Sequence, residues 1–375
     1  MKKVQVFCFD LINQNQKVNA LCKGLGRSDI CEINYVNNMS EVEVKKKLEQ
    51  ASSLVIDSSV YLASDQGTLN SPYMSFKGSV FISKYKNIFH LLITSSIRKI
   101  YVAHAHDIHW PGIDLQFLCK NIQGIAWVHH HPPIPQSEFT SSPYSEKWGT
   151  AHGNYWKNWQ YIKKNVGSSI EMPFFVFENE IVTKRKFFDV SVVGSNYKTR
   201  LNALEALKTS KYHLAPYYQI DGLIHQAVRK IPLKSSLNTI LIKSREINQN
   251  FCIERSKASF VCGSFMRYQV SKYFEIPARG SLAFAVPCVH YRHYGFKDGV
   301  NCVHTTPDSV VSDLKSILNK PNLLNKMSLS AQQFVKQEHS YSNRISQFIN
   351  VVNEFNKGHE VHGFYYNGKY ETNKC

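Results

Sequence analysis

The sequence lacks any long apolar run. No stretch approaches the roughly 18 consecutive apolar residues that are needed to cross a bilayer. The N-terminus has a basic start, MKKVQVFCFDLINQN, but its apolar run lasts only a few residues and is interrupted by Asp10 and Asn13. We therefore interpret Val4–Phe9 as a first β-strand rather than as a signal peptide, and we expect a chain that does not cross a membrane.

No pair of cysteines has the CxxC spacing of a redox or metal motif. The nine cysteines are scattered and odd in number, at positions 8, 22, 31, 119, 252, 262, 288, 302 and 375. Several lie in apolar runs such as FVCGSF, where a cysteine behaves as a small buried hydrophobe. This usage predicts reduced thiols and a cytoplasmic location.

Acidic residues are scarce relative to basic ones. The 375 residues contain 45 Lys and Arg against 28 Asp and Glu, which gives a net charge of +17. Such an excess favours anionic partners, namely phosphorylated small molecules, nucleic acid or an anionic membrane surface, although a generally basic surface explains it as well. Hydrophobic residues make up 43% of the chain, which excludes large-scale disorder, and its length suits two domains.

Apolar runs and amphipathic stretches alternate along the first half. We expect strands at Val4–Phe9 and at 30–36, 53–57, 99–105 and 124–130, with helices at 17–27, 41–51, 83–96 and 114–121. This alternation predicts a parallel sheet that is covered by helices on both faces. A loop-rich stretch with four prolines interrupts the pattern after residue 130.

A second cycle follows the basic linker Thr183–Phe187. We expect strands at 189–195, 211–218, 258–264, 281–290 and 301–306, helices at 200–210, 247–257, 268–280, 309–320, 321–339 and 341–355, and a tail without clear periodicity from Gly358. The prediction is an α/β fold of two Rossmann-like domains, 1–182 and 187–348, with 349–375 packing back on the first. Ligands are expected in an interdomain cleft, at the carboxyl ends of the strands.

The segment from Cys262 to Thr305 carries the most specific pattern. A Gly-Ser turn precedes a helix, an Ala-x-Gly helix end, a strand and a G-F-K-D-G-x-N loop; the residues concerned are Lys272, Phe274, Glu275, Ala278, Gly280, Phe296, Asp298, Gly299 and Asn301. In their order and spacing these motifs resemble the group 1 glycosyltransferases of the GT-B fold, in particular the spore-maturation-protein-like branch. The resemblance covers about Asp189–Phe348 and is only architectural before that. Arg267 departs from the pattern, because many retaining relatives carry a glutamate there, so the stereochemical outcome stays open.

The resemblance implies a site for a nucleotide-sugar donor, and the side chains suit it. Glu275 can accept hydrogen bonds from both ribose hydroxyls. Backbone N–H groups at the helix starts that follow two Gly-Ser turns can bind a diphosphate. The expected donor-binding residues are Glu275, Lys272, Gly194, Ser195, Lys198, Arg200, Gly263, Ser264, Arg267 and Gly280. The plainer alternatives are that Glu275 only pairs with Lys272 on a helix surface, and that Lys198 and Arg200 are solvated surface residues.

Polar residues follow two predicted strands of the first half. His104, His106, Asp107 and His109 end one strand, and His129, His130 and His131 end the next. We expect the group that activates the acceptor or contacts the sugar to be Asp107, His130 or His131. A zinc site and ordinary core histidines are the alternatives. An aromatic stretch at Trp148–Trp159 suits core packing, or else a stacking surface for an acceptor.

The sequence thus predicts an enzyme that moves a sugar from a nucleotide-sugar donor to a glycan, glycolipid or similar acceptor, in cell-surface polysaccharide synthesis. We expect no cofactor and no metal requirement, and a cytoplasmic protein with peripheral contact to an anionic membrane. The alternatives are a phage-type DNA glucosyltransferase that acts on duplex DNA, and a non-catalytic GT-B protein that binds a glycan or a partner. The charge is spread thinly, without a dense basic run, which disfavours DNA.

Overall fold

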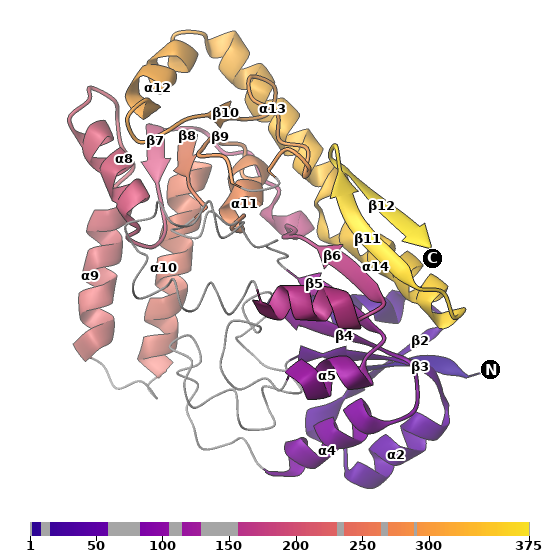
Figure 1. Cartoon of the computed structure of the whole chain (residues 1–375). Helices are drawn as coiled ribbons and strands as arrows, with labels where there is room; N and C mark the ends of the chain where they lie inside the picture. The colour runs from indigo at the N-terminus through magenta and orange to yellow at the C-terminus, as the bar shows by residue number, and fades with distance from the viewer. Residues whose placement is uncertain are drawn as a thin grey trace. The chain divides into compact units, whose positions relative to one another are not determined.

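The chain divides into two compact units. The computed structural model describes residues 2–8, 16–58, 83–104, 115–128, 157–230, 236–263, 269–288 and 291–374 (Figure 1). Unit 1 comprises residues 1–174 and 341–375, and unit 2 comprises residues 175–340. This division does not test the expected domain boundaries at 182, 187 and 348, which stay predictions.

Unit 1 contains an eight-stranded sheet of order β12-β11-β6-β5-β4-β3-β1-β2. Its strands are β1 (Lys3–Cys8), β2 (Cys31–Tyr35), β3 (Ala51–Asp57), β4 (Lys99–His104), β5 (Gly124–Val128), β6 (Ser168–Met172), β11 (Val361–Tyr366) and β12 (Lys369–Lys374). All neighbouring strands are parallel except β11 and β12. The parallel core arises because its strands are buried apolar runs joined through helices.

The helices of unit 1 have the amphipathic spacing seen in the sequence. They are α1 (Gln16–Gly24), α2 (Glu41–Glu49), α4 (Ser83–Thr94), α5 (Leu115–Asn121) and α14 (Tyr341–Asn356), and residues 157–165 are also helical. A capping box starts α2: Ser40 N donates to Glu43 Oε2 at 2.7 Å, and Glu43 N donates to Ser40 Oγ at 3.3 Å. α14 buries Phe348, Val351 and Val352 in the same core as β1 and β4.

The C-terminal tail is a β-hairpin, so the expectation of an irregular segment after Gly358 is wrong. β11 and β12 pair antiparallel around Asn367 and Gly368, whose φ angles are +49° and +85°. Two consecutive positive φ angles are the mark of a type I′ turn, and Asn-Gly is its preferred sequence. That dipeptide between two Tyr-rich runs was the signal that could have predicted the hairpin.

Unit 2 contains a four-stranded, all-parallel sheet of order β10-β9-β8-β7. Its strands are β7 (Phe188–Val192), β8 (Ser256–Val261), β9 (Leu282–Ala285) and β10 (Val303–His304), and its helices are α8 (Lys198–Lys208), α9 (Tyr217–Lys230), α10 (Ser236–Glu254), α11 (Lys272–Ala278), α12 (Val310–Leu318) and α13 (Pro321–Glu338). Two separate sheets, which are parallel apart from the β11–β12 pair, confirm the predicted fold class.

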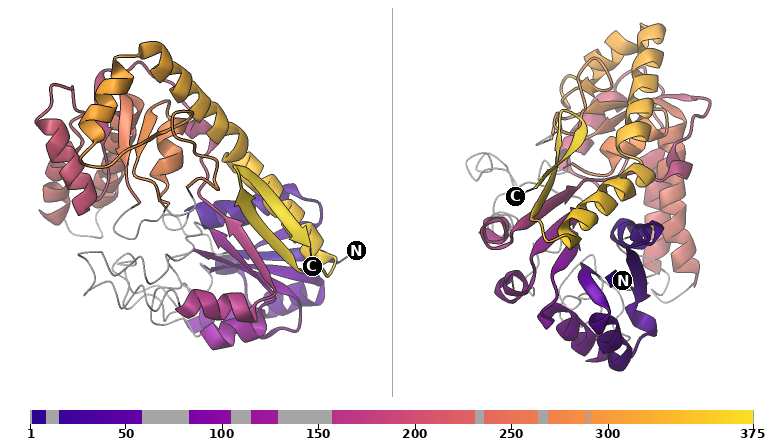
Figure 2. Two further views of the ribbon diagram at one scale, coloured as in Figure 1. Left: turned by 45° about the horizontal axis from the view of Figure 1, so that its top comes forward. Right: turned by 90° about the vertical axis from the view of Figure 1, so that its right-hand side faces the viewer.

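Two segments of unit 2 differ from the sequence prediction. The expected strand at 211–218 forms only an isolated bridge, Val190 to Leu214, and α9 begins at Tyr217. α10 starts at Ser236, well before the helix expected from residue 247. Two helices, α9 and α10, therefore follow α8 and precede β8 in the chain. They lie side by side, as Figures 1 and 2 show. In the described part of the chain, no helix is both long and apolar enough to span a membrane.

Candidate donor site

The loop between β7 and α8 brings charged side chains onto a glycine. Gly194 has a φ of +103°, a conformation that side chains with a Cβ rarely adopt. A Cβ atom at Gly194 would lie 2.8 Å from Cε and 3.2 Å from Nζ of Lys272, and 3.0 Å from Nη1 of Arg200. Glycine is therefore required both by the backbone and by the two cations that approach it.

Arg200 is built into this loop rather than solvated. The residue is 2% exposed. Its Nη1 donates to the carbonyl oxygen of Ser195, and its guanidinium carbon lies 5.3 Å from the ring centroid of Tyr197. Nε of Arg200 is buried and has no hydrogen-bond partner among the described residues. The interpretation of Arg200 as a solvated surface residue is thus wrong. A cation buried this deeply is costly unless an anion or a set of acceptors compensates it.

Tyr218 of α9 supports the same loop, and sequence analysis missed it. Its hydroxyl donates to the carbonyl oxygen of Gly194 at 3.0 Å. Burial raises the pKa of Tyr218, while the nearby charge of Arg200 lowers it. The net shift is upward, so the hydroxyl remains a donor at neutral pH. Because α9 was not predicted, no local signal linked Tyr218 to Gly194.

The start of α8 presents a positive end to the same loop. α8 has no acidic residue in its first turn, and Lys198 stands at its first position with an exposed side chain. Ser195, between Gly194 and the helix, is exposed as well. Free N–H groups at a helix start, together with the helix dipole, attract anions. With Lys272 and Arg200 alongside, this loop is suited to bind a diphosphate.

α11 carries the other predicted donor residues. Five of the seven side chains of this helix are buried, and Lys272 and Glu275 are partly exposed. The two lie three residues apart, which places them on one side of the helix. Tyr273 fixes the opposite side through a hydrogen bond from its hydroxyl to Val286 O at 2.5 Å. The fold therefore presents a cation and a carboxylate together from a single rigid helix turn.

The second glycine turn is described only in part. Gly263 is buried just after β8, and β8 pairs with β7 with Val192 opposite Phe260. Gly194 and Gly263 therefore follow the carboxyl ends of adjacent parallel strands, where α/β sheets bind ligands. Ser264 and Arg267 lie outside the described residues, as do Asp107, His130 and His131, the expected acceptor-side group.

The F-K-D-G-V-N motif forms a tight turn that is held by its own side chains. Asp298 Oδ1 accepts from His304 N at 2.7 Å. Asn301 Oδ1 accepts from Lys297 N at 2.7 Å, and its Nδ2 donates to Gly295 O at 3.0 Å. Gly299 has a φ of +71°. The hydrogen bonds explain the Asp and the Asn of the motif, and the positive φ angle explains its Gly.

The two aromatic motif residues connect this turn to α11. Phe274 and Phe296 have ring centroids 5.5 Å apart, and Phe296 stacks on Tyr291 at 4.7 Å. His339 packs on Phe274 at 4.8 Å, and its Nε2 hydrogen-bonds with Tyr294 O at 2.9 Å. This buried cluster fixes the orientation of α11, and with it Lys272 and Glu275.

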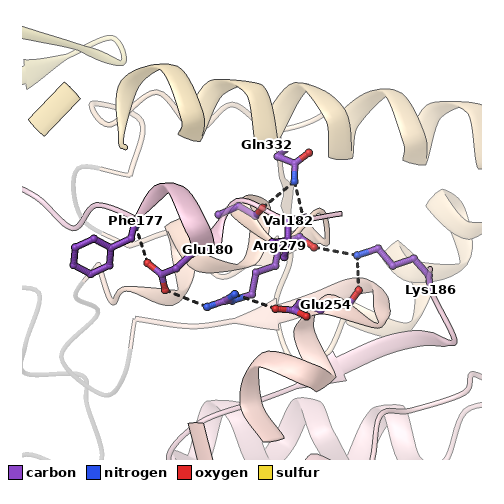
Figure 3. A network of polar contacts seen from close by, with 8 residues as sticks. Phe177, Glu180, Val182, Lys186, Glu254, Arg279 and Gln332 are labelled. Atoms are coloured by element: carbon purple, nitrogen blue, oxygen red, sulfur yellow. Dashed lines mark hydrogen bonds and ion pairs between the residues drawn. The ribbon is translucent and has the colours of Figure 1, made fainter. Parts of the chain in front are cut away.

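The other end of α11 is anchored by a polar network, shown in Figure 3. Arg279 donates to Glu180 and to Glu254, each at 3.1 Å. Lys186 donates to Glu254 O at 3.0 Å and to Arg279 O at 3.2 Å; burial lowers its pKa to about 8, an effect that Glu254 partly opposes. The network ties residues of the linker to the ends of α10 and α11.

Gly280 lies beside this network and not beside Gly194. With a φ of +65° it follows α11, and a Cβ atom there would be 3.5 Å from Thr183 Oγ1 and 3.6 Å from Nε2 of Gln332. Gln332 Nε2 in turn donates to Val182 O and Ala278 O (Figure 3). Gly280 thus ends the helix at the opposite end from Lys272.

Comparisons with known proteins relate part of the sequence to one family and the chain to solved structures. Residues 251–350 match the sequence profile of the family described as Glycosyl transferase-like. A search of curated proteins finds no match. Sucrose-phosphate synthase from Thermosynechococcus elongatus shares 9% identity with a TM-score of 0.50, over 96% of this chain and 100% of that one. Anabaena HepE, in complex with UDP and glucose, shares 11% identity with a TM-score of 0.47, over 94% of this chain and 100% of that one.

The profile match and the fold agree with the resemblance to GT-B glycosyltransferases that the sequence motifs indicated. The profile includes α11 and the F-K-D-G-V-N turn, which are the segments that suggested the resemblance. The likeness to sucrose-phosphate synthase concerns the fold alone. The chain therefore has the GT-B fold, and its residues 251–350 are similar to glycosyltransferases.

Proposed function

We propose that this protein transfers a sugar from a nucleoside diphosphate sugar to a glycan, glycolipid or similar acceptor. One observation carries the proposal: Lys272 and Arg200 both approach Gly194 at the start of α8. A backbone turn with a helix start and two cations fits a diphosphate better than it fits a neutral ligand. The match of residues 251–350 to a glycosyltransferase family supports the same ligand class.

The candidate residues have distinct tasks in this proposal. Lys272 and Arg200 offset the charge that develops on the diphosphate as the bond to the sugar breaks. Glu275, beside Lys272 on α11, accepts hydrogen bonds from the ribose hydroxyls. Asp107, His130 or His131 takes the proton of the acceptor hydroxyl or orients the sugar. We also propose that Ser264 and Arg267, which follow Gly263 in the sequence, contact the phosphates.

The acceptor and the setting are further parts of the proposal. We propose a role in cell-surface polysaccharide synthesis at the cytoplasmic face of a membrane. The net charge of +17 supports contact with an anionic acceptor or anionic lipid. In the described part of the chain no cysteine forms a disulfide, and all eight cysteines there are buried, which supports a reducing compartment.

We also propose that transfer needs no metal ion. The two side-chain cations at Gly194 supply positive charge where metal-dependent transferases use a divalent ion. Turnover should therefore be the same in excess EDTA as in buffer with Mg²⁺. A large loss of turnover in EDTA that Mg²⁺ restores would contradict this part of the proposal.

The test of the donor site is a binding panel of nucleoside diphosphates and nucleotide sugars. UDP-glucose is a suitable first member, and thermal shift detects binding because a ligand raises apparent stability. The variant is Lys272→Gln. The matched control is Lys208→Gln at the far end of α8, where Lys208 pairs with Glu205 at the surface. Loss of a charge-assisted hydrogen bond of about 1.5–3 kcal/mol should weaken donor binding roughly 10- to 150-fold in Lys272→Gln alone.

Either of two results would overturn the proposal. The first is a wild-type protein that binds no member of the panel. The second is a Lys272→Gln variant that binds the donor as tightly as Lys208→Gln does.

A further inference from the structure

Exposed apolar side chains gather on one part of unit 2. Among the described residues, 11 large hydrophobic side chains are exposed, and six of them lie on α9, on α10 or directly before β7. These six form what we call the α9–α10 face: Phe187, Ile220, Leu223, Ile240, Ile247 and Phe251. The most exposed are Leu223 at 68% and Ile247 at 66%. Exposed apolar residues are common singly, but such a cluster marks an interaction surface.

The geometry of the helix pair puts these side chains on one side. α9 and α10 are antiparallel, because Arg245 pairs with Asp221 at 2.8 Å and Asn248 donates to Tyr217 O at 3.1 Å. These four residues define the facing sides of the two helices. On each helix, the exposed apolar residues lie about 110° around the helix axis from the facing side. Viewed along the chain direction of each helix, the rotation has the same sense in both. On antiparallel helices the same sense leads to the same side of the pair.

Basic and aromatic residues border the same face. The guanidinium carbon of Arg255 lies 5.2 Å from the ring centroid of Phe187 and 6.0 Å from that of Phe251, so one cation joins two exposed rings. Arg185 also lies over Phe187, at 5.7 Å. Lys184, next to Arg185, and Lys243 on α10 are exposed. The border of the face is therefore cationic.

We propose that the α9–α10 face docks on an anionic lipid bilayer. Exposed aliphatic side chains that insert among acyl chains, bordered by Arg, Lys and Phe at headgroup level, have the composition of an interfacial membrane surface. The positive border matches the negative potential of such a membrane, in line with the net charge of +17. The inference extends the proposed function, since a docked enzyme meets a lipid-linked acceptor, and its test does not depend on transfer.

The experiment is sedimentation of the full chain with two kinds of vesicle. One consists of phosphatidylcholine, and the other contains about 30% phosphatidylglycerol as well. The wild-type protein should sediment with the anionic vesicles, and less so as salt is raised. The variant Leu223→Glu/Ile247→Glu should lose at least about 10-fold in partitioning, because two apolar groups no longer leave water.

A matched control separates the face from overall charge. Leu329→Glu/Val42→Glu changes the net charge equally at two exposed apolar residues elsewhere, and it should bind like the wild type. The inference is overturned if both double variants bind equally, or if the wild type binds neither vesicle. It is also overturned if the wild type is a dimer that the α9–α10 variant dissociates without change in vesicle binding, because the face would then meet a second copy.

Thermal shift with UDP on the same samples keeps the two proposals apart. Retained UDP binding without vesicle binding contradicts only the membrane inference. Vesicle binding without any nucleotide binding contradicts only the proposed function. Retained UDP binding in both double variants also shows that each is folded.

Discussion

Lys272 lies against Gly194 although the two are far apart in the chain. A Cβ atom on Gly194 would come within 2.8 Å of Cε of Lys272, a distance that real Cβ contacts do not show. The contact joins the first turn of α11 to the loop after β7, and it brings a cation to the start of α8. The donor site that we propose depends on this approach.

The variant Gly194→Ala should weaken donor binding. Alanine is strained at a φ of +103°, and its methyl group would displace Lys272 or Arg200. We expect a loss of stability of about 1–2 kcal/mol and at least a 10-fold weaker affinity for a nucleoside diphosphate, measured by calorimetry and urea unfolding. Gly222→Ala in α9 is the control, since no described residue comes within 4 Å of its Cβ position. If the two variants bind the nucleoside diphosphate with equal affinity, the ligand does not bind next to Gly194.

The variant Glu275→Ala should raise the donor dissociation constant without unfolding the protein. Its carboxylate is partly exposed, and the buried side of α11 is held by Tyr273 and Phe274. Loss of one charge-assisted group costs about 1.5–3 kcal/mol, or roughly 10- to 150-fold in affinity. Glu205→Ala on the exposed surface of α8 is the control. Unchanged affinity for a nucleoside diphosphate at equal stability would remove Glu275 from the site.

Substitution of the acceptor-side group should lower turnover more than donor affinity. Asp107, His130 and His131 lie outside the described residues, so their assignment stays a prediction from the sequence. General acid–base assistance is typically worth about 10²–10⁴-fold, so alanine at the correct position should lower kcat by that factor. Transfer kinetics and donor binding of the three single variants provide the measurement. If all three keep near-native turnover, the chemistry involves other residues.

Glu171 of β6 should make unit 1 less stable as pH rises. Burial raises the pKa of its carboxyl from 4.5 to about 7, and a backbone hydrogen bond from Tyr365 acts in the opposite direction. Because the folded pKa is the higher one, the stabilisation is fully present below about pH 4.5 and is lost as pH rises through about 7. The shift corresponds to about 3 kcal/mol.

Hydrogen exchange of the β6 amides between pH 4.5 and 8 follows this effect within unit 1. Exchange free energies, after correction for intrinsic rates, should fall with pH in the wild type and stay nearly constant in Glu171→Gln. Glu205→Gln is the control, because Glu205 is an exposed residue of unit 2. Parallel curves for the wild type and Glu171→Gln would mean that Glu171 ionises normally.

The types of most elements follow from local pattern. The buried runs at β1, β3, β4 and β5, and the amphipathic spacing of α8, α12, α13 and α14, are short-range properties that the sequence displays directly. The α/β class and the donor motif are therefore available without a structure. The hairpin after Gly358 was available too, through Asn367-Gly368. Its strands were missed because their Tyr-rich alternation is weakly apolar.

Only the tertiary structure decided which residues meet. No periodicity predicts that Lys272 approaches Gly194, that Tyr218 supports the same loop, or that Arg279 binds Glu180 and Glu254. The reason is physical: helix and strand propensities act over a few residues, whereas burial of a cation depends on acceptors that distant segments bring together. The sequence thus determined the elements and the chemistry available, and packing determined that Arg200 is a buried group of the loop.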